Sequence, residues 1–138
     1  MKDFNYALML IKAGKYDAAR DIFEELLRND PRDKDLLYNL GMCHSELGDP
    51  EKAVAILSEC VKHYPNYSNA HVALGFAQVM LGQDAKAKDN FLRALEIDPV
   101  NSYALRNLGG LYGKENNFDK SIECLEINVD KCVIFCDS

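Results

Sequence analysis

The sequence predicts an all-α fold, a solenoid of four helical hairpins with about eight helices. Three observations predict it. Prolines recur without a gap every 34 residues, at Pro31, Pro65 and Pro99. Glycines recur at the same interval, at Gly14, Gly48 and Gly82, with Asn116 at the fourth place. Within each copy, apolar residues return every three or four positions, which is typical of amphipathic helices that pack on a core.

The second copy shows how each copy divides into two helices. Leu36 and Leu40 lie on one face of a first helix, and Gly48 can end that helix in the left-handed conformation. Asp49 can then cap the second helix, and Pro50 suits its first turn, where no backbone N–H is needed. The recurring prolines close each second helix, and polar groups follow them: Asp33, Asn66 or Tyr67-Ser68, and Asn101-Ser102. We therefore expect helices at residues 3–13, 16–29, 34–47, 50–63, 68–81, 84–97, 102–115 and 118–129.

Two further columns of the repeat describe how the helices pack. Small residues stand where two helices would touch, at Ala7, Gly41, Gly75 and Gly109 and again at Ala19, Ala53, Ala87 and Ser121. Bulky residues supply the partner surface, at Phe23, Leu57, Phe91 and Leu125. We expect the three glycines of the first column to let adjacent helices approach closely. Since one hairpin cannot bury its apolar face alone, neighbouring hairpins must stack into a continuous core.

These columns resemble the tetratricopeptide repeat family, whose pattern is W-x2-L-G-x2-Y, then A-x3-F, then P. The third copy reads His71-x2-Leu74-Gly75-x2-Gln78, then Ala87-x3-Phe91, then Pro99. The match is incomplete, because the Trp position never holds Trp and only Tyr112 keeps the aromatic residue of the third position. The resemblance implies a right-handed α-α superhelix at residues 1–131, with units at 1–33, 34–67, 68–101 and 102–131. An apolar tail follows at residues 132–138.

In this family the first helices of the hairpins line a concave groove that holds peptide segments of partner proteins. Carried over position by position, the resemblance implies a groove lined by Phe4, Asn5, Leu8, Tyr38, Asn39, Met42, Val72, Phe76, Met80, Arg106 and Asn107. The apolar members favour an apolar helix or strand as the ligand, since flexible Met and rigid aromatic side chains offer contact area. The alternative is that some of these residues belong to the core.

Asparagine recurs at one groove position, in Asn5, Asn39 and Asn107, and only Ala73 interrupts the series. An amide carries a donor and an acceptor, so it can bond a peptide backbone without reading side chains. The arrangement is similar to the asparagine ladder in the repeat superhelix of the O-linked N-acetylglucosamine transferases. The alternative is that asparagine at this position packs on the neighbouring helix and binds nothing.

Relatives that grip the C-terminal carboxylates of heat-shock chaperones use lysine, arginine and asparagine at fixed groove positions. One frame of this chain places Phe4, Leu8, Asn39, Asn69 and Ala73 there, and the other places Tyr38, Met42, Ala73, Tyr103 and Asn107. Neither frame supplies a cation. Because a carboxylate is held by charge-assisted donors, the sequence disfavours chaperone-tail binding.

Composition narrows the remaining functional classes. Sixteen Lys and Arg against 22 Asp and Glu give a net charge of -6, so the chain has no net positive field for nucleic acid. No stretch approaches the roughly 20 apolar residues of a membrane span, and the N-terminus lacks a signal-peptide pattern. Five cysteines without a CxxC pair fit reduced thiols, so we expect a cytoplasmic protein. The three histidines lack metal-ligand spacing, and we expect no metal, no cofactor and no enzymatic activity.

The sequence therefore favours a non-catalytic scaffold that binds a peptide segment of a partner protein. Two alternatives remain open: a self-associating module, or the substrate-recruiting arm of a larger enzyme. The first alternative rests on the last predicted helix, where Phe118, Ile122, Leu125 and Val129 would leave an apolar flank. Because Val133-Ile134-Phe135 is also apolar, we expect the tail to fold back or to join two copies into a homo-oligomer.

Overall fold

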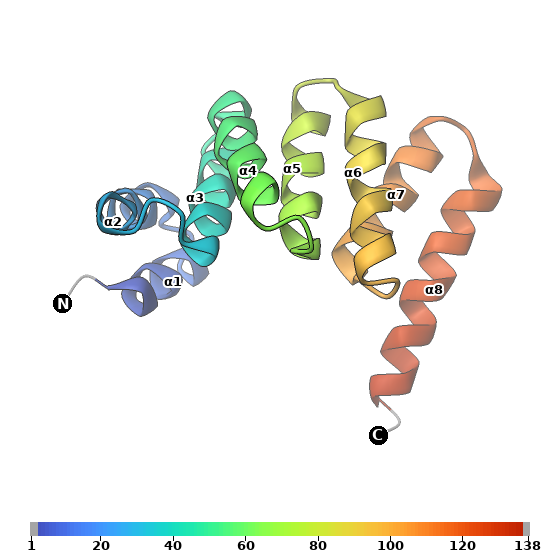
Figure 1. Cartoon of the computed structure of the whole chain (residues 1–138). Coiled ribbons are helices and arrows are strands. Elements are labelled where there is room, and N and C mark those ends of the chain that lie inside the picture. The colour runs from blue at the N-terminus through green and yellow to red at the C-terminus, as the bar shows by residue number, and fades with distance from the viewer. Residues whose placement is uncertain (1–2, 137–138) are drawn as a thin grey trace. The chain divides into compact units, whose positions relative to one another are not determined.

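The computed structural model describes the backbone of residues 3–136 and the side chains of residues 3–127. Within that range the chain forms eight α-helices and no strand, as predicted (Figure 1). They are α1 (Phe4–Lys12), α2 (Tyr16–Asn29), α3 (Lys34–Glu46), α4 (Pro50–His63), α5 (Ser68–Met80), α6 (Asp84–Ile97), α7 (Ser102–Lys114) and α8 (Phe118–Cys136). The first seven agree with the predicted bounds to within one residue at each end.

The last helix is longer than predicted. We expected it to end at residue 129, whereas α8 continues to Cys136. No glycine or proline lies between residues 129 and 136, so nothing local stops the helix there. Residues 132–136 of the expected tail are therefore helical in their backbone, and the tail's side chains and its last two residues lie outside the described part of the chain.

The helices fall into two compact units, Met1–Pro65 with α1 to α4 and Asn66–Ser138 with α5 to α8. Each unit holds two helical hairpins. In each, the second helix of the first hairpin also packs on the first helix of the second, α2 on α3 and α6 on α7. The core of unit 1 includes Leu10, Phe23 and Leu40, and the core of unit 2 includes Phe91 and Leu108. Each core thus draws residues from both hairpins of its unit.

One turn joins the two helices of every hairpin. Gly14, Gly48 and Gly82 have φ angles of 76°, 80° and 75°, and Asn116 takes the same place with φ 62°. This is the left-handed region, which glycine enters freely and asparagine tolerates better than most residues. The left-handed helix end expected at Gly48 is confirmed, and the fourth copy keeps the turn with asparagine.

Helix starts follow the predicted polar groups with one exception. The side chains of Asp33, Asp49 and Asn101 accept backbone N–H groups in the first turns of α3, α4 and α7. At α5, by contrast, the N-cap residue Tyr67 makes no side-chain cap bond. Ser68 instead donates its hydroxyl to the carbonyl oxygen of Ala94, at 2.9 Å, and so joins α5 to α6.

Two of the three packing glycines are needed where they stand. A Cβ atom added to Gly75 on α5 would lie 2.6 Å from Cε1 of Phe91 on α6, and one added to Gly41 would overlap the side chain of Leu57. At Gly109, however, the nearest atom to such a Cβ is Cβ of Cys124 at 3.5 Å, which is ordinary contact. The predicted close approach is therefore confirmed in α3–α4 and α5–α6, whereas α7–α8 are in contact at Gly109 but leave room for a Cβ atom there.

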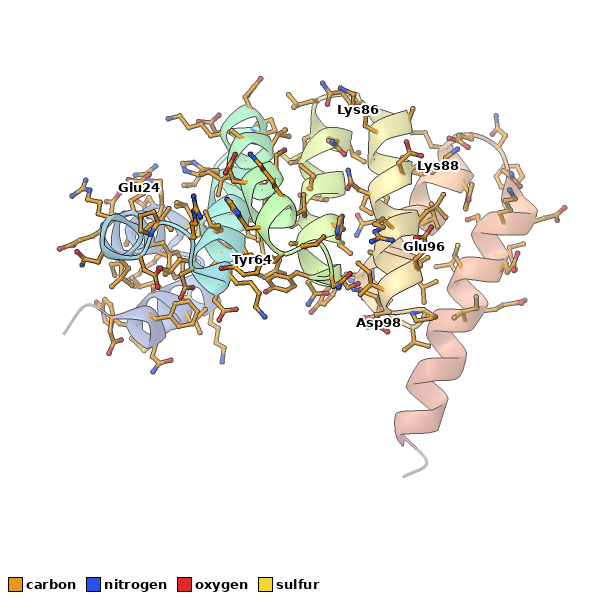
Figure 2. The ribbon with its side chains drawn as sticks, in the orientation of Figure 1. Glu24, Tyr64, Lys86, Lys88, Glu96 and Asp98 are labelled. Carbon is orange, nitrogen blue, oxygen red and sulfur yellow. The ribbon has the colours of Figure 1, made fainter. Side chains whose placement is uncertain are left out.

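Polar side chains tie the ends of the helices to neighbouring segments (Figure 2). The Tyr64 hydroxyl, at the end of α4, donates to the carbonyl oxygen of Arg32 ahead of α3. In unit 2, the Lys88 ammonium on α6 lies 2.6 Å from a carboxylate oxygen of Glu115, which follows α7. The hydrogen bond to Glu115 is the main reason why the pKa of Lys88 is raised. These contacts hold the hairpins of each unit in register.

Candidate functional site

In unit 1 the predicted groove residues lie on α1 and α3. Phe4 is half-buried, and its ring contacts that of Phe23 with centroids 5.7 Å apart. Leu8 also packs against the core of the unit. Asn5 is exposed, and the three residues from α3 are partly exposed: Tyr38, Asn39 and Met42. Unit 1 therefore offers an apolar face with amide groups, part of whose apolar area is already used by the core.

In unit 2 the predicted groove residues lie on α5 and α7, which contact each other directly. Phe76 and Met80, one turn apart on α5, are 40% and 42% exposed. Arg106 on α7 is exposed and its neighbour Asn107 is partly exposed. Val72 is buried in the core of unit 2, so we leave it out of the proposed binding surface. Unit 2 therefore presents two accessible apolar side chains beside a helix that carries a cation and an amide.

The asparagines of α3 and α7 share one geometry. Nδ2 of Asn39 donates to the carbonyl oxygen of Asp35 at 2.8 Å, and Nδ2 of Asn107 donates to that of Tyr103 at 2.7 Å. Each bond runs to the residue four positions earlier and fixes the amide along its helix. It leaves one N–H and the carbonyl oxygen of each amide without another hydrogen-bond partner among the described residues.

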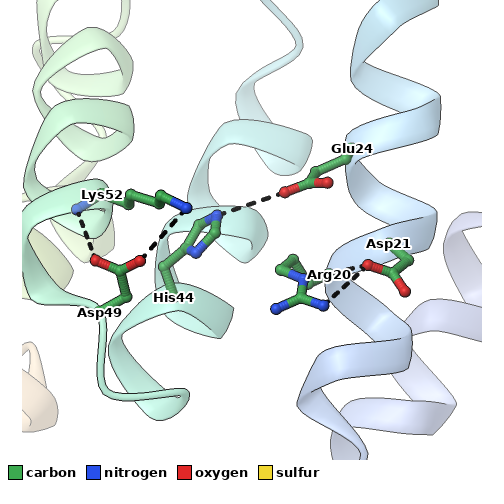
Figure 3. A network of polar contacts seen from close by, with 6 residues as sticks. All are labelled: Arg20, Asp21, Glu24, His44, Asp49 and Lys52. Atoms are coloured by element: carbon green, nitrogen blue, oxygen red, sulfur yellow. Dashed lines mark hydrogen bonds and ion pairs between the residues drawn. The ribbon is translucent and has the colours of Figure 1, made fainter.

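A separate polar cleft of about 270 Å³ lies in unit 1, on the side of α2, α3 and the start of α4. Its lining residues are Arg20, Asp21, Glu24, His44, Leu47, Asp49 and Lys52. Figure 3 shows that the charged groups pair with one another, Arg20 with Asp21 at 3.1 Å and Lys52 with Asp49 at 3.6 Å. The cleft is therefore a network of compensating charges at the junction of three helices.

His44 is the buried member of this network and stands at the family's usual aromatic position. Its Nε2 faces the Glu24 carboxylate (Figure 3). Burial lowers the pKa of His44, and the charge of Glu24 opposes that effect less strongly. A neutral imidazole is thus favoured in the folded protein.

A second polar cluster in unit 2 was not predicted. Nδ2 of Asn90 on α6 donates to Oε1 of Gln78 at 2.7 Å, and Oδ1 of Asn90 lies 3.3 Å from Nδ1 of His71. Both partners belong to α5, are buried, and stand at two positions where the sequence departs from the family pattern. The signal was available in the repeat, because the residues equivalent to Asn90 are Ile22, Ile56 and Cys124. One polar residue on α6 thus compensates for two polar departures on α5.

The described part of the chain contains no group of three His, Cys, Asp or Glu side chains placed to hold a metal ion. Cys43, Cys60 and Cys124 are free thiols, and burial raises the pKa of Cys43 to about 12 and that of Cys60 to about 11. These two thiols therefore stay protonated and serve as small core residues. Among the described helices, none is long and apolar enough to cross a membrane.

Helical hairpins repeated every 34 residues, with exposed side chains on their first helices, define an α-helical repeat protein. Two models of the tetratricopeptide repeat match the chain, one over residues 10–71 and one over residues 68–101. The chain belongs to the tetratricopeptide repeat family.

Curated relatives come from several kinds of protein. The chain is 29% identical to the BBSome complex member BBS4 of Bos taurus over 119 residues, which cover 86% of this chain and 23% of that protein. It is 27% identical to the protein O-mannosyl-transferase Tmtc3 of Drosophila melanogaster over 124 residues, 89% of this chain and 13% of that protein. It is 32% identical to the heat shock protein STI1 of Saccharomyces cerevisiae over 97 residues, 70% of this chain and 16% of that protein. The chain thus spans less than a quarter of each of these relatives.

Solved structures share the fold. TTC0263, a repeat protein of Thermus thermophilus, has a TM-score of 0.85 at 23% identity, over 91% of this chain and 71% of that one. The first repeat domain of Spaghetti (RPAP3), solved with the HSP90 peptide SRMEEVD, has a TM-score of 0.76 at 25% identity, over 81% of this chain and 89% of that one. The second structure shows that a protein similar to this chain binds a peptide.

Proposed function

We propose that this chain is a non-catalytic protein-interaction scaffold that binds a peptide segment of a partner protein. Within each unit the proposed binding surface is formed by the first helices of its hairpins, α1 and α3 in unit 1 and α5 and α7 in unit 2. Membership of the repeat family and the peptide-bound structure of a similar protein support an interaction role. The free cysteines and the lack of a membrane-spanning helix in the described part are consistent with the cytoplasmic location included in this proposal.

The observation that carries the proposal is the shared geometry of Asn39 and Asn107. Two different units fix the amide in the same orientation, with the carbonyl oxygen left to accept a hydrogen bond. A peptide backbone presents N–H and C=O groups at regular intervals, which such amides can bond whatever the side chains are. Phe76 and Met80 add exposed apolar contacts in unit 2. The ligand we infer is therefore a peptide with apolar side chains, held partly by its backbone.

The test starts from a phage-displayed library of random peptides, panned against the purified chain. The dissociation constant of a selected peptide is then measured by fluorescence anisotropy for wild type, Asn39→Ala, Asn107→Ala and Phe76→Ala. Each asparagine variant should weaken binding by about 0.5 to 1.5 kcal/mol, the net value of one hydrogen bond.

The matched control is Glu96→Ala, on the exposed surface of the second helix α6, where the ion pair of Glu96 among the described residues is with Arg93 of the same helix. It should bind the peptide like wild type. Loss of affinity in Glu96→Ala together with unchanged affinity in the three groove variants would place the ligand elsewhere.

A second candidate is the recruiting arm of a larger enzyme. One specific observation favours it: the protein O-mannosyl-transferase Tmtc3 is similar to this chain over 13% of its own length. In that case the repeats would hold a substrate protein for a catalytic domain encoded in the same gene. The complete reading frame of the gene distinguishes this candidate from an independent adaptor.

A further inference from the structure

The final helix exposes a residue that the other hairpins bury. Leu125 on α8 is 47% exposed, whereas the three residues at the same repeat position, Phe23, Leu57 and Phe91, are fully buried. One side of Leu125 lies near Gly109 of its own hairpin. Its other side is open, and Ile122, one turn earlier, is 52% exposed. The described part of α8 therefore presents an uncovered apolar face.

The first helix exposes the complementary positions. Tyr6 and Met9 on α1 are 38% and 55% exposed. Their equivalents in the other three copies are all buried: Leu40, Leu74 and Leu108 for Tyr6, and Cys43, Ala77 and Leu111 for Met9. These two repeat positions are buried by a neighbouring helix in the other three copies, and they are exposed on α1.

The chain itself shows what covers these positions. In unit 1, α2 packs on α3, and Phe23 shares a core with Leu40 and Cys43. In unit 2, α6 packs on α7, and Phe91 shares a core with Leu108 and Leu111. Each junction thus joins a second helix to the first helix that follows it. Because α8 is a second helix and α1 is a first helix, each carries one half of this junction.

The side chains at the rim of the two free halves also match each other. In unit 2 the junction is polar at its rim: the Lys88 ammonium lies 5.3 Å from the centre of the Tyr112 ring and forms an ion pair with Glu115. The residue equivalent to Lys88 on α8 is the exposed Ile122, while the residue equivalent to Glu115 in the first copy is the exposed Ala13. Polar partners are thus replaced by apolar ones on both halves at once. A second copy of this chain therefore matches the free faces in polarity.

We propose that copies of this chain bind one another head to tail, with α8 of one copy packed on α1 of the next. The contact is heterologous, so each bound pair still has one free α8 face and one free α1 face. Association therefore continues with rising concentration and does not stop at a symmetric dimer. The proposal does not depend on peptide binding, which uses other positions of the first helices.

Sedimentation velocity over a concentration series of the full chain tests the proposal. The average mass of wild type should rise steadily above the monomer mass of 15.6 kDa. Met9→Glu and Leu125→Glu should each sediment as monomers, because each places a carboxylate in one half of the junction. An equimolar mixture of the two variants should form a 1:1 dimer and nothing larger, since only one intact α8 face and one intact α1 face remain per pair.

The other arrangements give different results. If the copies instead form an α8–α8 dimer, Met9→Glu should associate like wild type. If wild type stays monomeric at every concentration, the free faces do not bind each other. Either result overturns the proposal. Circular dichroism confirms that each variant is folded, and Ile122→Glu replaces Leu125→Glu if the latter unfolds. Phe76→Ala separates this inference from the proposed function, since it should lose peptide affinity and still self-associate.

Discussion

Nε2 of His44 on α3 lies 3.7 Å from Oε1 of Glu24 on α2. The imidazole side chain is almost fully buried where α2, α3 and the start of α4 meet. Burial lowers the pKa of His44 below its ordinary value of 6.5. The unfolded chain therefore takes up a proton at this residue at higher pH than the folded chain does. The contribution of His44 to the stability of the fold should be fully present above the pKa that His44 has in the unfolded chain. It should be lost as the pH drops from there toward the lower pKa that His44 has in the folded chain.

His44→Gln tests this, because glutamine occupies the equivalent position at Gln78 and does not titrate. The free energy of unfolding, measured by urea denaturation at about pH 7.5 and about pH 5.5, should fall less on acidification in the variant than in wild type. An equal or larger loss in the variant would show that another group carries the pH dependence.

Gly75 and Gly109 occupy the same column of the repeat but differ in the space around them. Gly75→Ala forces the new methyl group into the ring of Phe91, so it should destabilise the protein by about 1 to 3 kcal/mol. Gly109→Ala meets only ordinary contacts and gains helix propensity, so it should stabilise by about 0.5 to 1 kcal/mol. Thermal melts of both variants beside wild type show whether the melting temperature falls for Gly75→Ala and rises for Gly109→Ala. Equal effects would mean that the hairpins α5–α6 and α7–α8 pack alike, contrary to the structure.

Asn90 supports two buried polar residues at once. Asn90→Leu removes the hydrogen bond to Gln78 and the contact to His71, and leaving the buried Gln78 oxygen without that bond should cost about 1 to 3 kcal/mol. The double variant Asn90→Leu, Gln78→Leu removes donor and acceptor together and should recover part of that loss. The comparison is made by urea denaturation. Additive effects of the two substitutions would argue against a coupled network.

We expect this chain not to bind the acidic C-terminal tails of chaperones. The peptide SRMEEVD, which the similar domain of Spaghetti (RPAP3) binds, is acidic. The positions of this chain that correspond to the carboxylate-gripping residues of that class hold no lysine or arginine. Anisotropy titration with labelled SRMEEVD should therefore show no saturable binding. Saturable binding that weakens in Asn39→Ala would show instead that amides alone can hold the acidic tail.

The repeat predicted most of the fold because it constrains each element several times. Prolines, turn glycines and capping residues recur at a fixed interval, so an error in one copy is corrected by the others. The end of α8 lacked such support, since the fourth copy holds Val133 where the other three have the closing proline. The space at Gly109 also escaped prediction, because Leu125 is the same residue type as Leu57, which fills the equivalent space at Gly41, so residue type alone does not set this contact.

The candidate site was less predictable than the fold. Repeat positions show which residues share a helix face, but they do not show how much of each side chain the core already covers. Val72 is buried while its counterpart Arg106 is exposed, although the two lie at the same position. The pairing of His44 with Glu24 and the network of Asn90 depend on contacts between helices, which a single sequence does not reveal.

The central claim, that the first helices bind a peptide, is tested most directly by mapping a selected peptide onto the chain by NMR. Amide chemical shifts are followed during titration of the ¹⁵N-labelled protein. We expect the largest changes on α3, α5 and α7, including Asn39, Phe76 and Asn107, and little change on α4 and α6. Changes concentrated on the second helices, with those three residues unaffected, would contradict it.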